Sequence, residues 1–395
     1  MEKFPSAIDL IASRKPDRPV LGVRPHASAR AARWFLNTFP GDVAYAYKAN
    51  SSVFLIGALY GAGIRHFDVA SLPELEDAAT IPGVELHFMH PVKSRSAIRR
   101  AYELGVRSFS LDSEDELAKI VQETTGASGP ARDLKLFVRI AVRPKNSRVP
   151  LEKKFGIDGA AAAKLLIKAR QVAAELGATF HVGSQTLTPD AYVAALEEVN
   201  RLIVQAGVVV DRLDIGGGFP SRYADSEPTP LATFMEAINA GIDKMAVRED
   251  VHLMCEPGRA LVAEAESLIV RVDARRGNDL YINDGAYGTL FDAAHLGFVF
   301  PARLVSRPEV KGETLVPFEM WGPTCDSIDQ MKGPFMLPDS ITEGDYIEIG
   351  NVGAYGRAIA GSFNGYGIYD EVIFEDEPML TMYSDASADT RKARG

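Results

Sequence analysis

A single lysine stands at the end of a short apolar and aromatic run, Val43-Ala44-Tyr45-Ala46-Tyr47-Lys48-Ala49-Asn50. Such a run is typical of a buried strand, and an ammonium at its mouth is unfavourable unless it is paired or used chemically. A desolvated lysine has a lowered pKa and can form a Schiff base as a nucleophile. A lysine that extends from a strand end toward solvent is the simpler interpretation. Other motifs must decide between this interpretation and a Schiff-base lysine.

Three glycines follow a later predicted strand, in Asp214-Ile215-Gly216-Gly217-Gly218-Phe219-Pro220. Without side chains, their backbone N–H groups can approach an anion such as phosphate. The run has neither the GxGxxG spacing of dinucleotide-binding folds nor the GK[ST] ending of a P-loop. A phosphate site after the seventh strand is a recurring feature of barrel enzymes. We therefore expect an anion-binding loop here, although many glycine runs are only turns.

A carboxylate, a guanidinium and an imidazole also lie at predicted strand ends. Glu256 and Arg259 belong to CEPGR, and His181 belongs to FHVGSQ, where small residues leave room for a flat ligand. Arg259 could bind a phosphate, and Glu256 could keep a ring nitrogen protonated, whereas a structural salt bridge is the simpler interpretation. Together with Lys48 and the glycine run, these residues describe a site for pyridoxal phosphate.

Cys325 and Asp326 adjoin each other in a Gly-Pro turn, Trp321-Gly322-Pro323-Thr324-Cys325-Asp326. An exposed thiol beside a carboxylate can relay protons, although a free cysteine is more often buried apolar filling. The only other cysteine is Cys255. Two cysteines give no disulfide framework and no metal-ligand spacing, so we expect no metal site and a reducing, cytoplasmic location.

The elements that must position these residues alternate between strands and helices, which favours a (β/α)₈ TIM barrel with its site at the strand C-termini. A doubly wound open sheet is the alternative. The predicted strands are Val43–Ala46, Arg65–Ala70, Glu85–His90, Ser108–Asp112, Lys135–Val142, Ala178–Val182, Arg212–Gly216 and Val251–Glu256. The predicted helices between them are Ser52–Ala62, Leu72–Thr80, Ser94–Leu104, Glu114–Glu123, Gly159–Leu176, Pro189–Gln205 and Thr229–Met245. Many end at a glycine that can cap the helix, namely Gly63, Gly105, Gly177 and Gly207.

After Gly258 the pattern changes to strands separated by Gly/Pro turns, which predicts a second, mostly β domain. We expect the barrel over residues 25–262 and the β domain over 1–24 and 263–395, with a mobile polar tail from Ser384 to Gly395. The later strands are predicted at Leu268–Asp273, Asp279–Ile282, Leu315–Met320, Tyr346–Ile349 and Glu371–Phe374.

The composition excludes several other classes of protein. The 395 residues carry a formal net charge of −10 and a pI near 5.3, which argues against a nucleic-acid partner. No apolar run is long enough to span a membrane, and the N-terminus lacks the layout of a signal peptide.

In order, the motifs resemble those of the fold-type III pyridoxal-phosphate decarboxylases, and are most similar to the ornithine/lysine decarboxylase group. The matching segments are YAYKAN, FDVASLPELE, FHVGSQ, DIGGGFP, CEPGR, NDGAYG, WGPTCDSID and GAYGRAIAGSFNGY, from about Tyr45 to Tyr366. This resemblance implies an alanine-racemase-like barrel, pyridoxal 5'-phosphate as cofactor, and a homodimer with shared active sites.

The resemblance also implies roles for individual residues. Lys48 would hold the cofactor as a Schiff base, His181 would stack on its ring, and Glu256 would keep the ring nitrogen protonated. In the partner subunit, Cys325 would reprotonate the α-carbon and Asp326 would receive the distal amine of the substrate. The remaining cofactor residues would be Ser184, Gly217, Gly218, Gly258, Arg259 and Tyr355 at the phosphate and Asp68, Glu74 and Arg139 around Lys48, with Asp292 and Tyr287 contacting the substrate.

The implied reaction is decarboxylation of L-ornithine and/or L-lysine to putrescine or cadaverine, in polyamine biosynthesis. Phe291 replaces the tyrosine that precedes the family's substrate aspartate, and the loop after Tyr287 is short, so the sequence leaves open which of the two amino acids is preferred. Diaminopimelate, arginine and carboxynorspermidine decarboxylases are alternatives, as is a non-catalytic regulatory relative. A racemase is a further alternative, but Glu256 argues against it, since alanine racemases place an arginine there.

Overall fold

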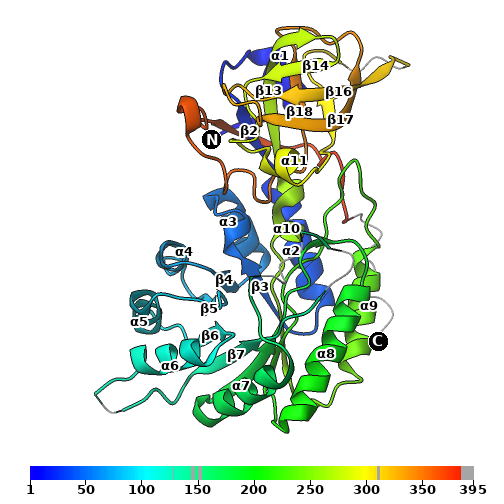
Figure 1. Ribbon diagram of the computed structural model, residues 1–395. Helices are drawn as coiled ribbons and strands as arrows, with labels where there is room; N and C mark the ends of the chain where they lie inside the picture. Colours follow the sequence, from blue (N-terminus) through cyan, green and yellow to red (C-terminus); the bar gives the residue numbers. More distant parts are fainter. Residues whose placement is uncertain (128, 144–146, 150–153, 309–311, 384–395) are drawn as a thin grey trace.

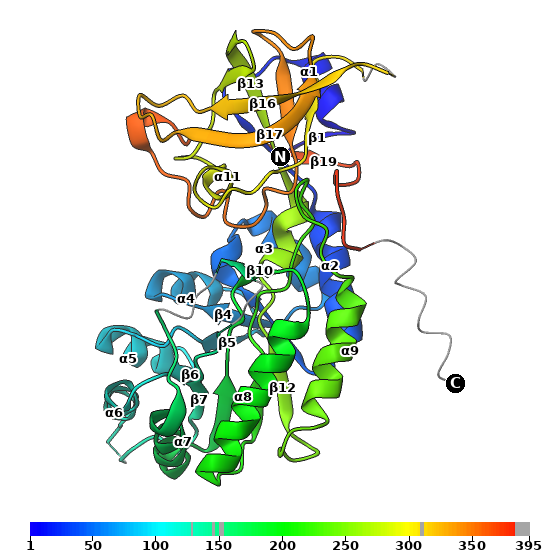
Figure 2. The same ribbon diagram turned by 45° about the vertical axis from the view of Figure 1, so that its right-hand side comes forward.

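The computed structural model describes residues 1–127, 129–143, 147–149, 154–308 and 312–383 (Figure 1). In this view a barrel lies below and a β-rich unit lies above, and Figure 2 shows the same two units from another side. The predicted tail at Ser384–Gly395 lies outside the described residues. Across the described ranges, no helix is long and apolar enough to cross a membrane.

The lower unit is a closed barrel of eight parallel strands, in the order β11-β12-β3-β4-β5-β6-β7-β9. This confirms the predicted fold class. Its walls are apolar, because alternate residues of each strand pack inward while the others face the surrounding helices. The strands are β3 (Asp42–Ala46), β4 (His66–Val69), β5 (Glu85–Phe88), β6 (Ser108–Leu111), β7 (Lys135–Arg139), β9 (Glu175–Thr179), β11 (Arg212–Asp214) and β12 (His252–Cys255).

A helix precedes or follows each strand and covers the outside of the barrel (Figure 2). Ser71, Ser94 and Ser113 each accept a hydrogen bond from the backbone N–H three residues later, which caps the helices that follow them. The helices are α2 (Pro25–Thr38), α3 (Val53–Ala62), α4 (Leu72–Ala78), α5 (Arg95–Glu103), α6 (Glu114–Glu123), α7 (Gly159–Val172), α8 (Asp190–Ala206), α9 (Leu231–Ile242) and the short α10 (Arg259–Val262).

The boundary between α7 and β9 was predicted wrongly. The sequence suggested a helix to Leu176, capped by Gly177, whereas α7 ends at Val172 and Gly177 lies inside β9. A Cβ at Gly177 would lie 2.4 Å from Phe137 Cδ1, so the glycine accommodates the ring on the neighbouring strand β7. The predicted glycine caps at Gly63 and Gly207 are confirmed, since both adopt left-handed conformations with positive φ.

The upper unit is a nine-stranded sheet that contains strands from both the N-terminal and the C-terminal parts of the chain. β2 lies between β19 and β13, which joins the N-terminal segment to the C-terminal half. The sequence missed β1, β15 and β17. The elements are β1 (Glu2–Phe4), α1 (Ala7–Ser13), β2 (Val20–Val23), β13 (Glu266–Arg276), β14 (Asp279–Ile282), α11 (Phe291–His295), β15 (Ala302–Leu304), β16 (Leu315–Trp321), β17 (Gln330–Pro338), β18 (Tyr346–Ile349) and β19 (Asp370–Phe374).

Arg24, directly after β2, is fully buried where the chain passes from the sheet into α2. Its guanidinium lies 2.8 Å from Glu348 Oε1 and 2.7 Å from Asp376 Oδ1, and donates to Ser267 Oγ. A buried charge is tolerated when it is paired and hydrogen-bonded in this way. These contacts fix the start of the barrel against the sheet.

Histidines gather at the opposite end of the barrel, where the strands begin. His87 on β5 is buried and stacks against His66 on β4, with 3.0 Å between His66 Nδ1 and His87 Nε2. Asp42 lies 3.4 Å from His66 and 2.5 Å from His252. Burial, and then the charge of His66, lower the pKa of His87 to about 4 from an ordinary 6.5.

We therefore expect His87 to destabilise the fold in mild acid. The unfolded chain binds a proton at His87 near pH 6.5 and the folded chain only near pH 4, so this residue lowers the free energy of unfolding by about 3 kcal/mol across that interval. His87→Asn should flatten this slope in urea unfolding curves measured between pH 7 and pH 4. An unchanged slope in the variant would show that other groups produce it.

Candidate active site

Two adjoining cavities open at the C-terminal ends of the barrel strands and share Lys48, His181 and Glu256. Most of the residues singled out in the sequence line them. The first is also lined by Ala46, Ser184, Gly218, Phe219, Gly258, Arg259 and Tyr355, and the second by Asp68, Ala70, Met89, His90, Pro91, Arg139, Lys154 and Phe155.

Lys48 lies in a 3₁₀ turn, Tyr47–Ala49, directly after β3. Its Nζ is 2.7 Å from Asp68 Oδ2, and its side chain is 39% exposed because it faces the cavity. Burial acts most strongly and lowers the pKa of Lys48, but Asp68, Tyr355 and Glu256 together outweigh it, and the pKa lies above its ordinary value. The expected lowering of the pKa is therefore wrong for this state of the chain. The ion pair with Asp68 therefore stabilises the Lys48 ammonium and fixes its position in the cavity.

His181 is held as a neutral imidazole beside Lys48. Burial, and then the positive charges of Arg139 and Lys48, lower its pKa well below the ordinary value. The backbone N–H of Gly183 donates to His181 Nδ1 at 3.0 Å, which leaves Nε2 to carry the ring proton. A neutral ring with a fixed orientation can stack on a flat ligand.

Glu256 directly follows β12 and is paired with Asp214 at the end of β11. Burial, and then Asp214 and Asp68, raise the pKa of Glu256 well above its ordinary value. Asp214 accepts hydrogen bonds from Thr179 Oγ1 and Gly216 N as well as from Glu256, so the negative charge resides on Asp214 and the proton on Glu256. Glu256 Oε1 is buried and finds no hydrogen-bond partner within the described ranges.

The glycine run forms a wall without side chains. A Cβ at Gly217 would lie 2.5 Å from the Glu256 carbonyl oxygen, and one at Gly218, where φ is +105°, would lie 2.4 Å from the Gly183 carbonyl oxygen. Glycine is required at both positions. At Gly258, on the opposite side, a Cβ would lie 3.1 Å from the Cβ of Ala46.

Arg259 is buried at the end of this cavity, where its guanidinium contacts three side chains. It donates to Ser184 Oγ at 3.3 Å, to Tyr223 Oη at 2.8 Å and to Asp292 Oδ2 at 2.8 Å. Tyr355, at a positive φ of 62°, places its ring 5.1 Å from the guanidinium carbon. Asp292 is thus buried against Arg259, and it lines neither cavity.

Arg139 and Glu74 were both expected near Lys48. Arg139 lines the second cavity, with its guanidinium carbon 5.7 Å from the centre of the Phe155 ring. Glu74 Oε2 accepts a hydrogen bond from the N–H of Ala70 at 2.7 Å, and burial raises the pKa of its carboxyl. Glu74 therefore holds the loop after β4 and does not face the cavity.

Cys325, Asp326 and Tyr287 lie in the β unit and line neither cavity. Tyr287 Oη donates to Asp326 Oδ2 at 2.5 Å, which lowers the pKa of Asp326 and raises that of Tyr287 to about 12. Cys325 is exposed, and its Sγ donates to Asn364 Oδ1 at 3.4 Å. One chain thus brings the lysine side of the site together but not these three residues.

Sequence reasoning assigned no role to Asp214 or Tyr223. Asp214 stood within the quoted glycine motif, and an acid before a glycine run is a usable signal for a partner of another strand-end carboxylate. Tyr223 follows Pro220 in a loop without periodicity, and nothing in its local sequence indicates a contact with Arg259.

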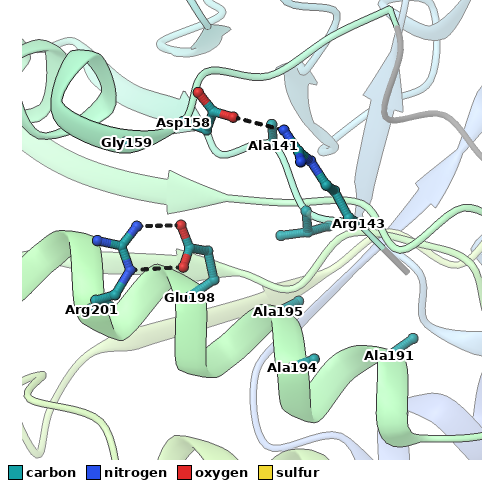
Figure 3. Close-up of a pocket in the computed structure, with 10 residues that line it drawn as sticks. Ala141, Arg143, Asp158, Gly159, Ala191, Ala194, Ala195, Glu198 and Arg201 are labelled. Carbon is teal, nitrogen blue, oxygen red and sulfur yellow. Dashed lines mark hydrogen bonds and ion pairs between the residues drawn. The ribbon is translucent and has the colours of Figure 1, made fainter. Parts of the chain in front are cut away.

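A larger hollow lies outside the barrel, on the flank of α7 and α8 (Figure 3). Alanines form its floor, and its charges are already paired, Arg143 with Asp158 at 3.4 Å and Arg201 with Glu198 at 2.6 Å. It shares no lining residue with the two cavities at Lys48 and contains none of the groups with a shifted pKa described above. We therefore take the cavities at Lys48 as the candidate active site.

Comparisons with known proteins identify the family of the chain. Residues 26–263 match the family described as "Pyridoxal-dependent decarboxylase, pyridoxal binding domain". The chain is 33% identical over 360 residues to a lysine/ornithine decarboxylase of Selenomonas ruminantium, covering 89% of this chain and 88% of the relative.

Solved structures of similar proteins have the same fold. One is a Vibrio vulnificus lysine/ornithine decarboxylase complexed with putrescine, with a TM-score of 0.79 and 29% identity over 94% of this chain and 99% of that one. Another is the arginine decarboxylase of Paramecium bursaria Chlorella virus bound to agmatine, with a TM-score of 0.81 and 27% identity over 92% and 98%. The chain belongs to the pyridoxal-dependent decarboxylases, and the predictions of family and cofactor, pyridoxal phosphate, are both confirmed.

Proposed function

We propose that the protein decarboxylates a basic L-amino acid, L-ornithine and/or L-lysine, to putrescine or cadaverine in polyamine biosynthesis. The observation that carries this proposal is the convergence on one cavity of the Lys48–Asp68 pair and the protonated Glu256 beside Asp214. The activities of the similar proteins support the same substrate class. We also propose a cytoplasmic location, from the cysteine usage, and functional units of 25–262 and of 1–24 with 263–395.

The residues present fit pyridoxal phosphate. The side-chain-free wall of Gly217 and Gly218 can admit a phosphate, and Ser184, Arg259 and Tyr355 can donate hydrogen bonds to it. The orphaned Glu256 Oε1 is an acceptor suited to a protonated ring nitrogen. When bound, the cofactor supplies an electron sink for the pair left on the α-carbon as carbon dioxide departs.

The chain's own groups then have separate tasks. Asp68 would hold the Lys48 amino group at the cavity for covalent attachment. The Glu256–Asp214 pair holds one proton and one negative charge, which would keep a ring nitrogen at Glu256 Oε1 protonated. Neutral His181 would pack against the ring without adding a competing positive charge.

A second copy of the chain would complete the site. Cys325 and Asp326 are on the surface beside exposed apolar residues, and a patch of this kind marks a protein interface. We propose a homodimer in which the partner subunit supplies the thiol that reprotonates the α-carbon and the carboxylate that receives the distal amine. The exposed apolar residues are Ile328, Ile359, Phe363, Tyr366 and Ile368.

Asp326 is the better candidate for the distal amine. Its lowered pKa keeps it ionised, whereas the Asp292 carboxylate is already paired with Arg259. We still retain Asp292 and Tyr287 as proposed substrate residues, since Tyr287 orients Asp326. Diaminopimelate, arginine and carboxynorspermidine remain alternative substrates on the same scaffold.

We expect purified protein with pyridoxal phosphate to release carbon dioxide from L-ornithine, L-lysine or both, with the matching diamine as product. The panel includes diaminopimelate, arginine and carboxynorspermidine, and chiral analysis of unreacted substrate detects a racemase. Release only from one of those three, or racemisation without carbon dioxide, would overturn the substrate assignment. No turnover of any kind would favour a regulatory role.

We also expect borohydride to fix the cofactor to Lys48. Reduction makes the lysine–cofactor bond permanent, so peptide mapping should place the label in the segment that contains Tyr45–Asn50. Lys48→Ala should carry no label, whereas Lys93→Ala, which removes the buried lysine paired with Glu116, should keep it at Lys48. Label at any other lysine contradicts the assignment.

A further inference from the structure

Asn50, two residues after Lys48, is a buried amide whose hydrogen-bonding groups are all used. Its Nδ2 donates to Glu266 Oε2 at 3.0 Å and to the Gly353 carbonyl oxygen at 2.8 Å. Its Oδ1 accepts from the N–H of Ser52 at 2.9 Å, and it is fully excluded from solvent. An amide this completely satisfied can hold only one orientation.

These contacts join the two units of the fold. Asn50 follows β3 of the barrel, whereas Glu266 begins β13 of the sheet and Gly353 belongs to the loop that carries Tyr355. The N–H of Tyr355 donates to the Ala49 carbonyl oxygen at 2.9 Å, so the two segments are joined at adjacent residues. A Cβ at Gly353 would lie 1.9 Å from the Val262 carbonyl oxygen, which shows how closely this loop lies against the barrel.

Glu266 depends on Asn50 for its position. It is fully buried, and its Oε1 has no hydrogen-bond partner among the residues described. The nearest cation is Arg357, with Nε 3.8 Å away. The Asn50 amide is therefore the donor that satisfies this buried carboxyl, and its loss would leave an unsatisfied polar group at the junction.

We infer that Asn50 and Glu266 are positioning residues that set the separation between Lys48 and the phosphate cradle at Tyr355. The inference rests on the proposed function, in which Lys48 and Tyr355 hold opposite ends of one rigid cofactor. A misplacement of about 1 Å at a reacting centre can lower a rate by 10²-fold. The hydrogen-bonded pair fixes that separation because it attaches the lysine turn and the Tyr355 loop to the same strand.

The test compares two ligands that differ only in the phosphate. Pyridoxal engages the Lys48 end alone, whereas pyridoxal phosphate must reach both ends. Asn50→Asp replaces the donor amide by a carboxylate oxygen that faces two other acceptors, Glu266 and the Gly353 carbonyl. We expect this variant to weaken binding of pyridoxal phosphate at least 10-fold more than binding of pyridoxal. Glu266→Gln keeps an acceptor for Asn50 and should keep the ratio of the two affinities within about twofold of wild type.

Affinities are measured by absorbance titration, and borohydride fixation at Lys48 is measured in parallel. Asn200→Asp, which keeps the acceptor that the N–H of Ala246 uses, is the matched control. If Asn50→Asp does not fold, the two affinities are measured for Asn50→Ser instead, and the same change in their ratio is expected. A folded variant with the wild-type ratio overturns the inference. Failure of the wild type itself to fix the cofactor at Lys48 would instead count against the proposed function.

Discussion

We expect Glu256→Ala to lower kcat for carbon dioxide release by about 10²-fold, the lower end of the range for loss of an acid–base group. The variant removes both the proton at the Glu256–Asp214 pair and the acceptor Oε1. A ring nitrogen without that partner loses its proton at neutral pH, and a neutral ring withdraws electrons weakly. The chemical step should slow, whereas attachment of the cofactor at Lys48 should not.

The effect is measured as single-turnover carbon dioxide release at saturating cofactor and substrate. Borohydride fixation at Lys48 shows that the cofactor is still in place. Glu198→Ala, which removes a carboxylate paired with Arg201 on the outside of the barrel, should leave kcat unchanged. A Glu256→Ala enzyme with wild-type kcat would mean that another group holds the ring nitrogen protonated.

The barrel could be predicted because its signals are local. Lys48, His181 and Glu256 each adjoin a short apolar run, and the geometry of a barrel places every such strand end on one face. The helix-to-strand boundary near Gly177 could not be predicted, because the glycine is needed to make room for Phe137, which lies on another strand. Where the role of a residue depends on a partner distant in sequence, the local sequence pattern predicts the secondary structure wrongly.

In the candidate site, too, the features that depend on contacts distant in sequence could not be predicted. The sequence indicated Lys48 from its strand, but the shift of its pKa was predicted with the wrong sign. Asp68 on the next strand, together with Tyr355 and Glu256, outweighs the effect of burial. Asn50 stood in the opening motif without a role because Glu266 and Gly353 lie more than 200 positions away. Residue types at strand ends indicate which chemistry is possible, and the fold decides which charges face one another.

The same consideration applies to Asp292. Its resemblance to a substrate-binding acid came from its place in the family's motif, but the structure pairs its carboxylate with Arg259 at 2.8 Å in a buried setting. A buried ion pair of this kind fixes the guanidinium in place. The distal amine of the substrate would then bind Asp326, which does not line the cavity of its own chain.

Mixing Lys48→Ala with Cys325→Ala should recover about one quarter of wild-type activity from two inactive proteins, if subunits exchange at random in a two-fold dimer. Half of the dimers would then carry one chain of each kind, and one of their two sites would combine an intact Lys48 with an intact Cys325. The physical reason is that Cys325 is exposed and Asp326 half-buried, and that neither residue lines the cavities at Lys48. Co-expression with two different tags isolates the mixed dimers for the carbon dioxide assay.

Lys48→Ala mixed with Glu256→Ala is the matched control. Both residues line the same cavity of one chain, so each site of that mixed dimer keeps one defect and no activity should return. Recovery in the first mixture but not in the second requires that Cys325 acts across the subunit boundary. If neither mixture recovers although mixed dimers form, each site would be complete within its own chain, and Cys325 would act, if at all, beside its own Lys48.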